Sequence, residues 1–323
     1  MSRRLLRGLG ALLLASLLAG AAFALPATSG AGVVAATTPS AAKAPPVPLL
    51  WKVSGRDGAT LYLLGSFHLL HPDDYPVAPE VDAAFARASR VVFELPAEQV
   101  QSPALGEQML QAATRTDGST LRDDLSAEQW AALQAYATRQ GLPLAALSGY
   151  KPWFVGLTVS LTEMSRQGLD PSLGLDQHFM RAAQAAGKPT SGLETASEQI
   201  ALLDGMTLQE QQQMLAEALD DARDGNRQSS ELHAAWRSGD ARRMWSEMAL
   251  EMRRDYPALY KNINVARNDR WVPKLVQFLQ PGQGTTLVVV GTLHLLGEDG
   301  VVEKLRAKGY VVERVCEACR KVD

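Results

Sequence analysis

Two histidines occupy matching places in a segment that occurs near both ends of the chain. The segments are LYLLGSFHLL over 61–70 and LVVVGTLHLL over 287–296. Each has an apolar run, a glycine, a hydroxyl residue, an apolar residue, His and two Leu, so His68 and His294 are equivalent. Imidazole is the commonest metal ligand among side chains and can also transfer protons near neutral pH. The pair is therefore the first candidate site, and the alternative is a coincidental likeness of two core strands.

A carboxylate follows at a similar place in the next predicted strand. The segment RVVFEL over 90–95 comes one predicted helix after the first copy, and Glu94 lies near its carboxyl end. Strand ends joined by adjacent crossovers share one edge of a sheet, so we expect Glu94 beside His68 and His294. Two imidazoles and one carboxylate suit Zn, Mn, Fe or Co and leave positions open for water. The alternative for Glu94 is a carboxylate that accepts hydrogen bonds from helix N–H groups.

Glu194 and Arg267 complete the set of candidate catalytic residues, together with Glu94. Glu194 ends another predicted strand, and it could be a fourth ligand, a general base or a structural carboxylate. Arg267 lies in ARNDR at the start of a predicted helix, where it could pair with a site carboxylate or carry a solvated charge. Pro72 favours an extended conformation for His71, so the rings of His68 and His71 need not face together. We expect His71 at most to contact a ligand, and not to bind the metal itself. Two further histidines are expected to be ordinary surface or core residues: His178 and His233.

Buried strands must position these side chains. Apolar runs without alternation are typical of strands covered on both faces, as in parallel sheets. Segments 49–53 and 60–65 predict a hairpin around 55–58, and 310–315 predicts a last strand. Neither end of the chain has enough strands for a stable sheet alone. We therefore expect an α/β fold, with a central, mostly parallel sheet built from N- and C-terminal strand–helix units.

A long helical insert, about 97–280, separates the two ends. We treat 49–323 as a single domain that contains this insert, although the pattern does not place helices within 97–125. A short strand is predicted over 188–193. Capping residues and apolar spacing predict the helices over 79–89, 126–141, 152–167, 175–186, 207–225, 240–254 and 264–279.

The N-terminus has the features of an export signal. Three arginines precede an apolar stretch over 12–18 and the small-x-small segment AFA over 22–24, which predicts a signal peptide over 1–24. The stretch is too short and too rich in Ala and Gly for a good membrane span, and a retained anchor is the alternative. Residues 25–48 predict a flexible leader. We expect a periplasmic or secreted protein without a membrane span after signal removal.

The charge balance argues against a nucleic-acid partner. The formal net charge is −3, and it becomes −6 without Arg3, Arg4 and Arg7 of the predicted signal. No basic stripe is left to bind phosphates. The sequence also lacks a His-Glu-x-x-His helix, a Gly-x-Ser-x-Gly elbow and a phosphate-binding loop. A peptide or a small molecule is the expected substrate, and the oligomeric state stays open.

Cys316 and Cys319 are the two cysteines of the chain. Two cysteines cannot form a four-cysteine zinc site. An exported protein meets an oxidising compartment, so we expect a disulfide between them. A redox pair would normally open a helix after a strand, whereas a charged tail follows here. The expected role is to hold the end of the last strand.

The motifs together resemble the TraB/PrgY/GumN family, which is related to the Tiki metalloproteases. The resemblance covers about 51–315, and the family's two Gly-x-x-His motifs match 65–68 and 291–294, while its acidic residue matches Glu94. The first motif has Ser-Phe where Thr and Ile or Val are more usual. In chain order the matching segments are LYLLGSFH, VVFEL, GLDQHF, GLET followed by Gln199, ARND and VVVGTLHLLGEDG.

The resemblance implies a metal-dependent, peptidase-like fold related to erythromycin esterase and to haem-binding ChaN-type proteins. Our first hypothesis is a metal-dependent hydrolase in which His68, Glu94 and His294 hold the ion. The second is a non-catalytic protein that binds a peptide signal, haem or iron at the same sheet edge. The third is an interaction partner of an envelope or exopolysaccharide system, in which the histidines only support the fold.

Overall fold

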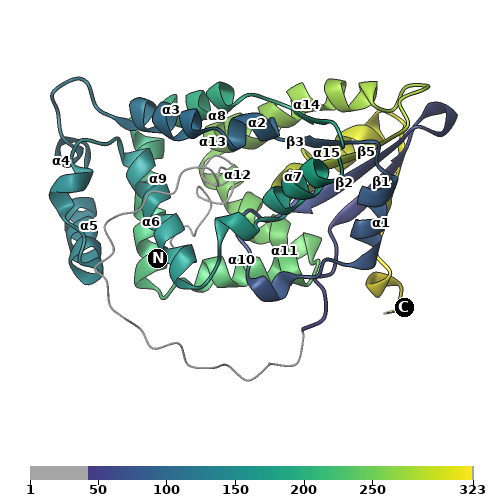
Figure 1. Ribbon diagram of the computed structural model, residues 1–323. Coiled ribbons are helices and arrows are strands. Elements are labelled where there is room, and N and C mark those ends of the chain that lie inside the picture. The colour runs from purple at the N-terminus through teal and green to yellow at the C-terminus, as the bar shows by residue number, and fades with distance from the viewer. Residues whose placement is uncertain (1–42, 322–323) are drawn as a thin grey trace.

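The computed structural model describes residues 43–321, and the predicted signal peptide lies outside them. Within that range six strands form one sheet in the order β4-β3-β5-β2-β1-β6 (Figure 1). The strands are β1 (Leu50–Ser54), β2 (Thr60–Ser66), β3 (Arg90–Phe93), β4 (Thr190–Gly192), β5 (Thr285–Gly291) and β6 (Val311–Arg314).

The strands of the two repeated segments lie side by side at the centre of this sheet. β2 pairs in parallel with β5, and β5 pairs in parallel with β3, which pairs in parallel with β4. β1 is antiparallel to both β2 and β6. The expected α/β fold with a mostly parallel sheet from both ends of the chain is therefore confirmed.

Helices make up most of the segment between β3 and β5. The helices of the described residues are α1 (Pro79–Arg87), α2 (Ala97–Val100), α3 (Pro103–Ala113), α4 (Leu121–Asp124), α5 (Ala127–Gln140), α6 (Pro152–Arg166), α7 (Leu175–Ala185), α8 (Ala196–Asp204), α9 (Leu208–Arg223), α10 (Arg227–Arg237), α11 (Ala241–Trp245), α12 (Glu251–Asp255), α13 (Pro257–Tyr260), α14 (Ala266–Gln277) and α15 (Val301–Ala307). Two π-helical segments interrupt the series, η6 (Ser246–Leu250) and η7 (Lys261–Val265). None of the helices within 43–321 has the length and apolarity needed to cross a bilayer.

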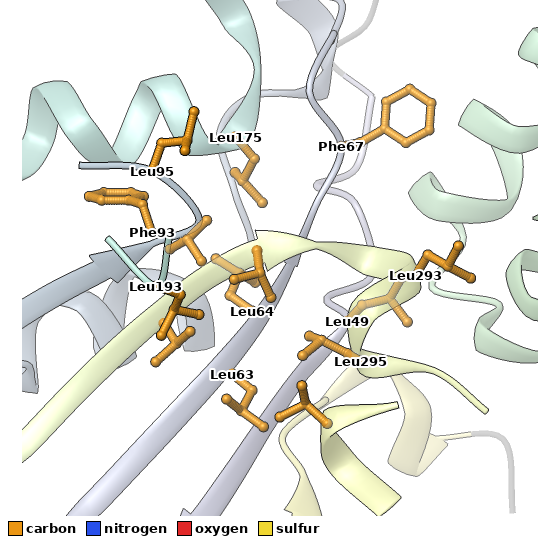
Figure 2. Close-up of a cluster of buried hydrophobic side chains, with 14 of the residues drawn as sticks. Leu49, Leu63, Leu64, Phe67, Phe93, Leu95, Leu175, Leu193, Leu293 and Leu295 are labelled. Atoms are coloured by element: carbon orange, nitrogen blue, oxygen red, sulfur yellow. The ribbon is translucent and has the colours of Figure 1, made fainter. Parts of the chain in front are cut away.

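The main hydrophobic core surrounds the central strands. Side chains of β2 and β5 such as Leu63 and Val288 are fully buried, which explains the apolar runs without alternation. Apolar neighbours of both histidines, including Phe67 and Leu295, belong to the same core (Figure 2). This packing restrains the backbone on either side of each histidine.

A second hydrophobic cluster lies within the helical insert. It joins residues of α4, α5, α6 and α9, and Leu133 and Leu215 are fully buried in it. Figure 1 shows α4 and α5 at the end of the molecule away from the sheet. The insert thus has packing of its own beyond its contacts with the main core.

The predicted elements agree with the structure, with shifts of a few residues at their ends. The hairpin of β1 and β2 is present, and Ser126 caps α5 as the capping box predicts, with Gly141 in the left-handed conformation at the other end. The helix predicted over 240–254 comprises α11, η6 and α12. Part of the predicted leader is placed in the structure: Pro46 and Pro48 are buried against the domain.

Candidate metal centre

Both histidines of the repeated segments lie directly beyond the carboxyl ends of the central strands. His68 follows the end of β2 by two residues, and His294 lies in the short 3₁₀ segment η8 (Thr292–Leu295) after β5. The Thr292 hydroxyl donates to the Ser66 carbonyl at 2.9 Å and so links the two motifs. Parallel neighbours end at the same edge, and both imidazoles are buried there.

Glu94 reaches the same place from the other side of β5. It directly follows β3, and its Oε1 accepts a 2.7 Å hydrogen bond from the Gly291 backbone N–H. A methyl group on Gly291 would lie 3.0 Å from Glu94 Oε1, 3.3 Å from His68 Nε2 and 3.7 Å from His294 Cδ2. The three predicted ligands therefore surround one small space, which the absence of a side chain at Gly291 leaves open.

Each imidazole is held through its Nδ1 atom. His68 Nδ1 lies 3.0 Å from Asp176 Oδ1, and His294 Nδ1 lies 2.8 Å from Asn268 Oδ1. The Nε2 atoms of both rings are buried and have no hydrogen-bond partner among the described residues. Buried polar atoms normally have partners, so these two nitrogens are the donor atoms of the site that are free to bind a ligand.

Arg267 pairs with both predicted site carboxylates. Its guanidinium is fully buried and donates through Nη2 to Glu94 Oε2 at 2.6 Å and through Nε to Glu194 Oε1 at 2.9 Å. A second, shorter contact joins Nη2 to Glu194. Of the two alternatives for Arg267, pairing with a site carboxylate is the one found.

Glu194 is surrounded by donors. Besides Arg267, it accepts from Trp271 Nε1 at 3.3 Å and from Gln199 Nε2 at 2.7 Å. The same Gln199 amide donates to Glu94 Oε2 at 3.1 Å, so it bridges the two carboxylates. This arrangement suits Glu194 to holding Arg267 in place, and its role as a general base or fourth ligand stays a prediction.

The charges favour an ionised Glu94 and a neutral His294. Burial alone would raise the pKa of Glu94, but the Arg267 guanidinium, the two imidazoles and the Gly291 N–H together outweigh burial, and the pKa falls to about 2. Burial, reinforced by Arg267, lowers the pKa of His294 to about 3. For His68 burial acts in the same direction, yet the charge and hydrogen bond of Asp176 raise its pKa above 6.5.

These residues fit a divalent transition metal by their chemistry. Two imidazole nitrogens without partners and an ionised carboxylate are a donor set that Zn, Mn, Fe and Co accept. No group of three His, Cys, Asp or Glu side chains within 43–321 is already arranged as a metal cage. Ligation would therefore require the side chains around Gly291 to adjust.

Sequence reasoning assigned no role to Asp176, Asn268, Gln199 or Trp271. The first three lie in the segments GLDQHF, ARND and GLET…Q, which carry the family resemblance. These segments indicate the family, but they do not indicate what the three side chains do. Their roles depend on contacts between residues far apart in the chain, such as Asp176 with His68.

The other histidines lie outside this centre. His71 Nδ1 is 3.0 Å from the Gly168 carbonyl, and the Nε2 atom of His233 is 2.7 Å from Asp74 Oδ2. The ring of His178 packs on Tyr75, with centroids 4.9 Å apart. None of these contacts involves His68, Glu94 or His294.

Comparisons with known proteins identify the family of the chain. The profile of the TraB/PrgY/gumN family matches residues 49–314, which include every candidate ligand. The chain is 26% identical to the uncharacterized protein YbaP of Escherichia coli (strain K12) over 252 residues, 76% of this chain and 87% of the relative. The uncharacterized protein YbaP of Shigella flexneri matches to the same extent. No solved structure shows significant similarity.

Proposed function

The chain belongs to the TraB/PrgY/gumN family, and from that premise we propose that it is a metal-dependent hydrolase. Peptide bonds are the proposed substrate, and the periplasm or the outside of the cell is the proposed location. The observation that carries the proposal is the pair of buried, unpartnered Nε2 atoms of His68 and His294 beside Glu94.

The buried charges support a cation at this place. Glu94 and Glu194 are buried against the guanidinium of Arg267, and a third buried carboxylate, Asp176, lies against His68. Buried charges without compensation are strongly unfavourable. With His294 neutral, a divalent ion would offset the negative charge that the Arg267 guanidinium leaves.

The surrounding residues would prepare the ligands for that ion. Arg267 keeps Glu94 ionised, so this carboxylate is available at neutral pH. The low pKa of His294 keeps its ring neutral, so one ring nitrogen has a lone pair that can bind an ion. Gln199 and Glu194 restrain the Glu94–Arg267 pair. A bound divalent ion would act as a Lewis acid that polarises a carbonyl group and makes water a better nucleophile.

Metal analysis of protein purified without chelators tests the proposal. We expect bound Mn, Zn, Fe or Co, or an increase in melting temperature when one of them is added. His68→Ala and His294→Ala should remove this effect. Wild-type protein that neither contains nor responds to any of the four metals would contradict the proposal.

Gly291→Ala tests whether the ion occupies the predicted space. Its methyl group would fill that space while leaving every ligand in the chain, so metal binding should be lost. Gly65→Ala is the matched control from the first motif, because its methyl would press on Thr292 and Leu49 instead. The control should retain the metal response even if its melting temperature falls.

Peptide cleavage and location require separate assays. Metal-loaded protein should hydrolyse members of a mixed peptide library, and the His68→Ala variant should not. Metal binding without any cleavage would favour the binding-protein hypothesis. Cell fractionation with N-terminal sequencing should find a mature chain that starts near Leu25.

A further inference from the structure

We infer that Asp176 and Asn268 are positioning residues that fix both imidazoles with the proton on Nδ1 and a free lone pair on Nε2. This inference deepens the proposed function and rests on it for the identity of the ligand. The tautomers themselves follow from hydrogen bonds that exist without any ion. Asp176 and Asn268 would thus determine whether the centre can accept a metal.

The orientation of the Asn268 amide determines which nitrogen of His294 carries the proton. Its Nδ2 donates to the Asp299 carbonyl at 2.8 Å and faces Asn264 Oδ1 at 3.4 Å. The flipped amide would place Oδ1 against the Asp299 carbonyl, which has no proton to give. Oδ1 of Asn268 must therefore face His294 Nδ1 as an acceptor, and Nδ1 must carry the proton.

The Asp176 carboxylate determines which nitrogen of His68 carries the proton. The Asp176 carboxylate accepts hydrogen bonds and cannot donate when ionised. Its Oδ1 receives the Ser66 hydroxyl at 3.0 Å and lies 3.0 Å from His68 Nδ1. In the neutral imidazole the Nδ1 atom must be the donor, which leaves the lone pair on Nε2.

The opposite tautomer is unfavourable at both rings. It would direct a lone pair of Nδ1 at an acceptor oxygen of Asp176 or Asn268. It would also place an N–H on a buried Nε2 atom that has no acceptor among the described residues. The ligand-ready tautomer is therefore built into the fold, and it comes from α7 for His68 and from α14 for His294.

Two pairs of variants separate this role from a general structural one. Asp176→Asn keeps an acceptor oxygen where two donors require it, whereas Asp176→Leu removes the acceptor. Asn268→Leu likewise removes the acceptor that faces His294 Nδ1. Asp269→Asn, on the exposed side of the same helix, is the matched control. Nitrogen-15 NMR of the metal-free protein, at a pH where both imidazoles are neutral, reports each tautomer directly.

We expect Asp176→Leu to move His68, and Asn268→Leu to move His294, toward the Nε2–H form. Each should lower metal affinity about 10–100-fold, while Asp176→Asn and Asp269→Asn keep the wild-type tautomers. Unchanged tautomers in both leucine variants would overturn the inference. A wild type with the stated tautomers but no metal affinity would instead overturn the proposed function and leave the positioning role standing.

Discussion

At the scale of single residues, Arg267 is the residue that compensates the charges of two buried carboxylates. It is fully buried and pairs with Glu94 and Glu194, both of which are buried as well. Arg267→Met would leave two carboxylates in the core without their guanidinium. Removing one partner of a buried ion pair typically costs about 3–5 kcal/mol, and we expect a loss of that size in the free energy of unfolding, measured with urea.

Arg270→Met is the control for this prediction. Arg270 lies on the same helix, its side chain is 46% exposed, and it approaches Glu194 only at 4.0 Å. Exposed pairs contribute at most about 1 kcal/mol, so the control should be nearly as stable as the wild type. Equal losses in the two variants would show that the buried network contributes nothing specific.

The grouping of the three candidate ligands could be predicted from the sequence, but the residues that hold them could not. His68 and His294 stood out because a whole segment repeats around them, and Glu94 because it ends a buried strand. Asp176 and Asn268 lie on helices, where an acid or an amide is ordinary. Only the folded chain brings Asp176 to His68, 108 positions away.

At the scale of elements, Gly156 governs how closely α6 and α9 approach. A methyl group on Gly156 would lie 2.9 Å from the Cα atom of Leu215. Alanine is a better helix former by about 1 kcal/mol, but inserting a methyl into tight packing costs about 1–3 kcal/mol. Because the obstacle is backbone, we expect Gly156→Ala to lower the free energy of unfolding overall.

Urea unfolding with a control on the same helix checks this balance. Ser160→Ala adds no atom to the α6–α9 contact and should change stability by less than about 0.5 kcal/mol. A stabilised Gly156→Ala variant would mean that the two helices separate at little cost.

Asp74 connects the short segment η3 (Pro72–Asp74) to α10. Its buried carboxylate accepts from the His71 backbone N–H at 2.8 Å, lies 2.7 Å from His233 Nε2 and pairs with Arg237. Burial alone would raise the pKa of Asp74, but these partners outweigh it and lower the pKa below its ordinary value. Asp74 therefore stabilises the fold above its unfolded pKa of about 3.9, and this contribution is lost as the pH falls further.

Asp74→Asn should consequently destabilise the protein most at neutral pH. We expect a loss of about 1–3 kcal/mol there, and a smaller difference from the wild type below pH of about 4. Unfolding with urea over a series of pH values measures both. Asp73→Asn, at the exposed neighbour that pairs with Lys43, should cost at most about 1 kcal/mol. A loss that stays constant down to low pH would contradict the electrostatic explanation.

Elements with strong local signals were predictable, and those fixed by tertiary contacts were not. The capping box at Ser126 and the apolar runs of β2 and β5 are local features, and both predictions were confirmed. The helices between 97 and 125 include two of only four residues, which leave little periodicity to read. The strand pairing also places Ser66, not Gly65, opposite Gly291. That offset of one residue depends on packing between the strands.

At the scale of the whole molecule, the two ends of the described chain pack against each other at one edge of the sheet. β6 forms the sheet edge against β1, and the Arg314 guanidinium donates to the Pro48 carbonyl at 2.9 Å. The Val47 N–H donates to the Arg237 carbonyl at 2.9 Å, which joins the N-terminal segment to the helical insert. The single sheet built from both ends was predictable because neither end has enough strands alone. The attachment of the segment before β1 was not, because its composition is that of a linker.

The disulfide lies just after β6, and it joins Cys316 to Cys319 as predicted. It closes a loop of only four residues, so its effect on the entropy of the unfolded chain is worth about 2 kcal/mol at most. We expect the double Cys316→Ser, Cys319→Ser variant to lose no more than that in a urea titration. Its metal response should be unchanged, because the bond lies beyond β6, on the side of β1 away from β5. Deleting the chain from Val311 onward should cost far more, because it removes a strand from β1. If the double serine variant lost its metal, the tail would have to belong to the centre and the ligand set would be incomplete.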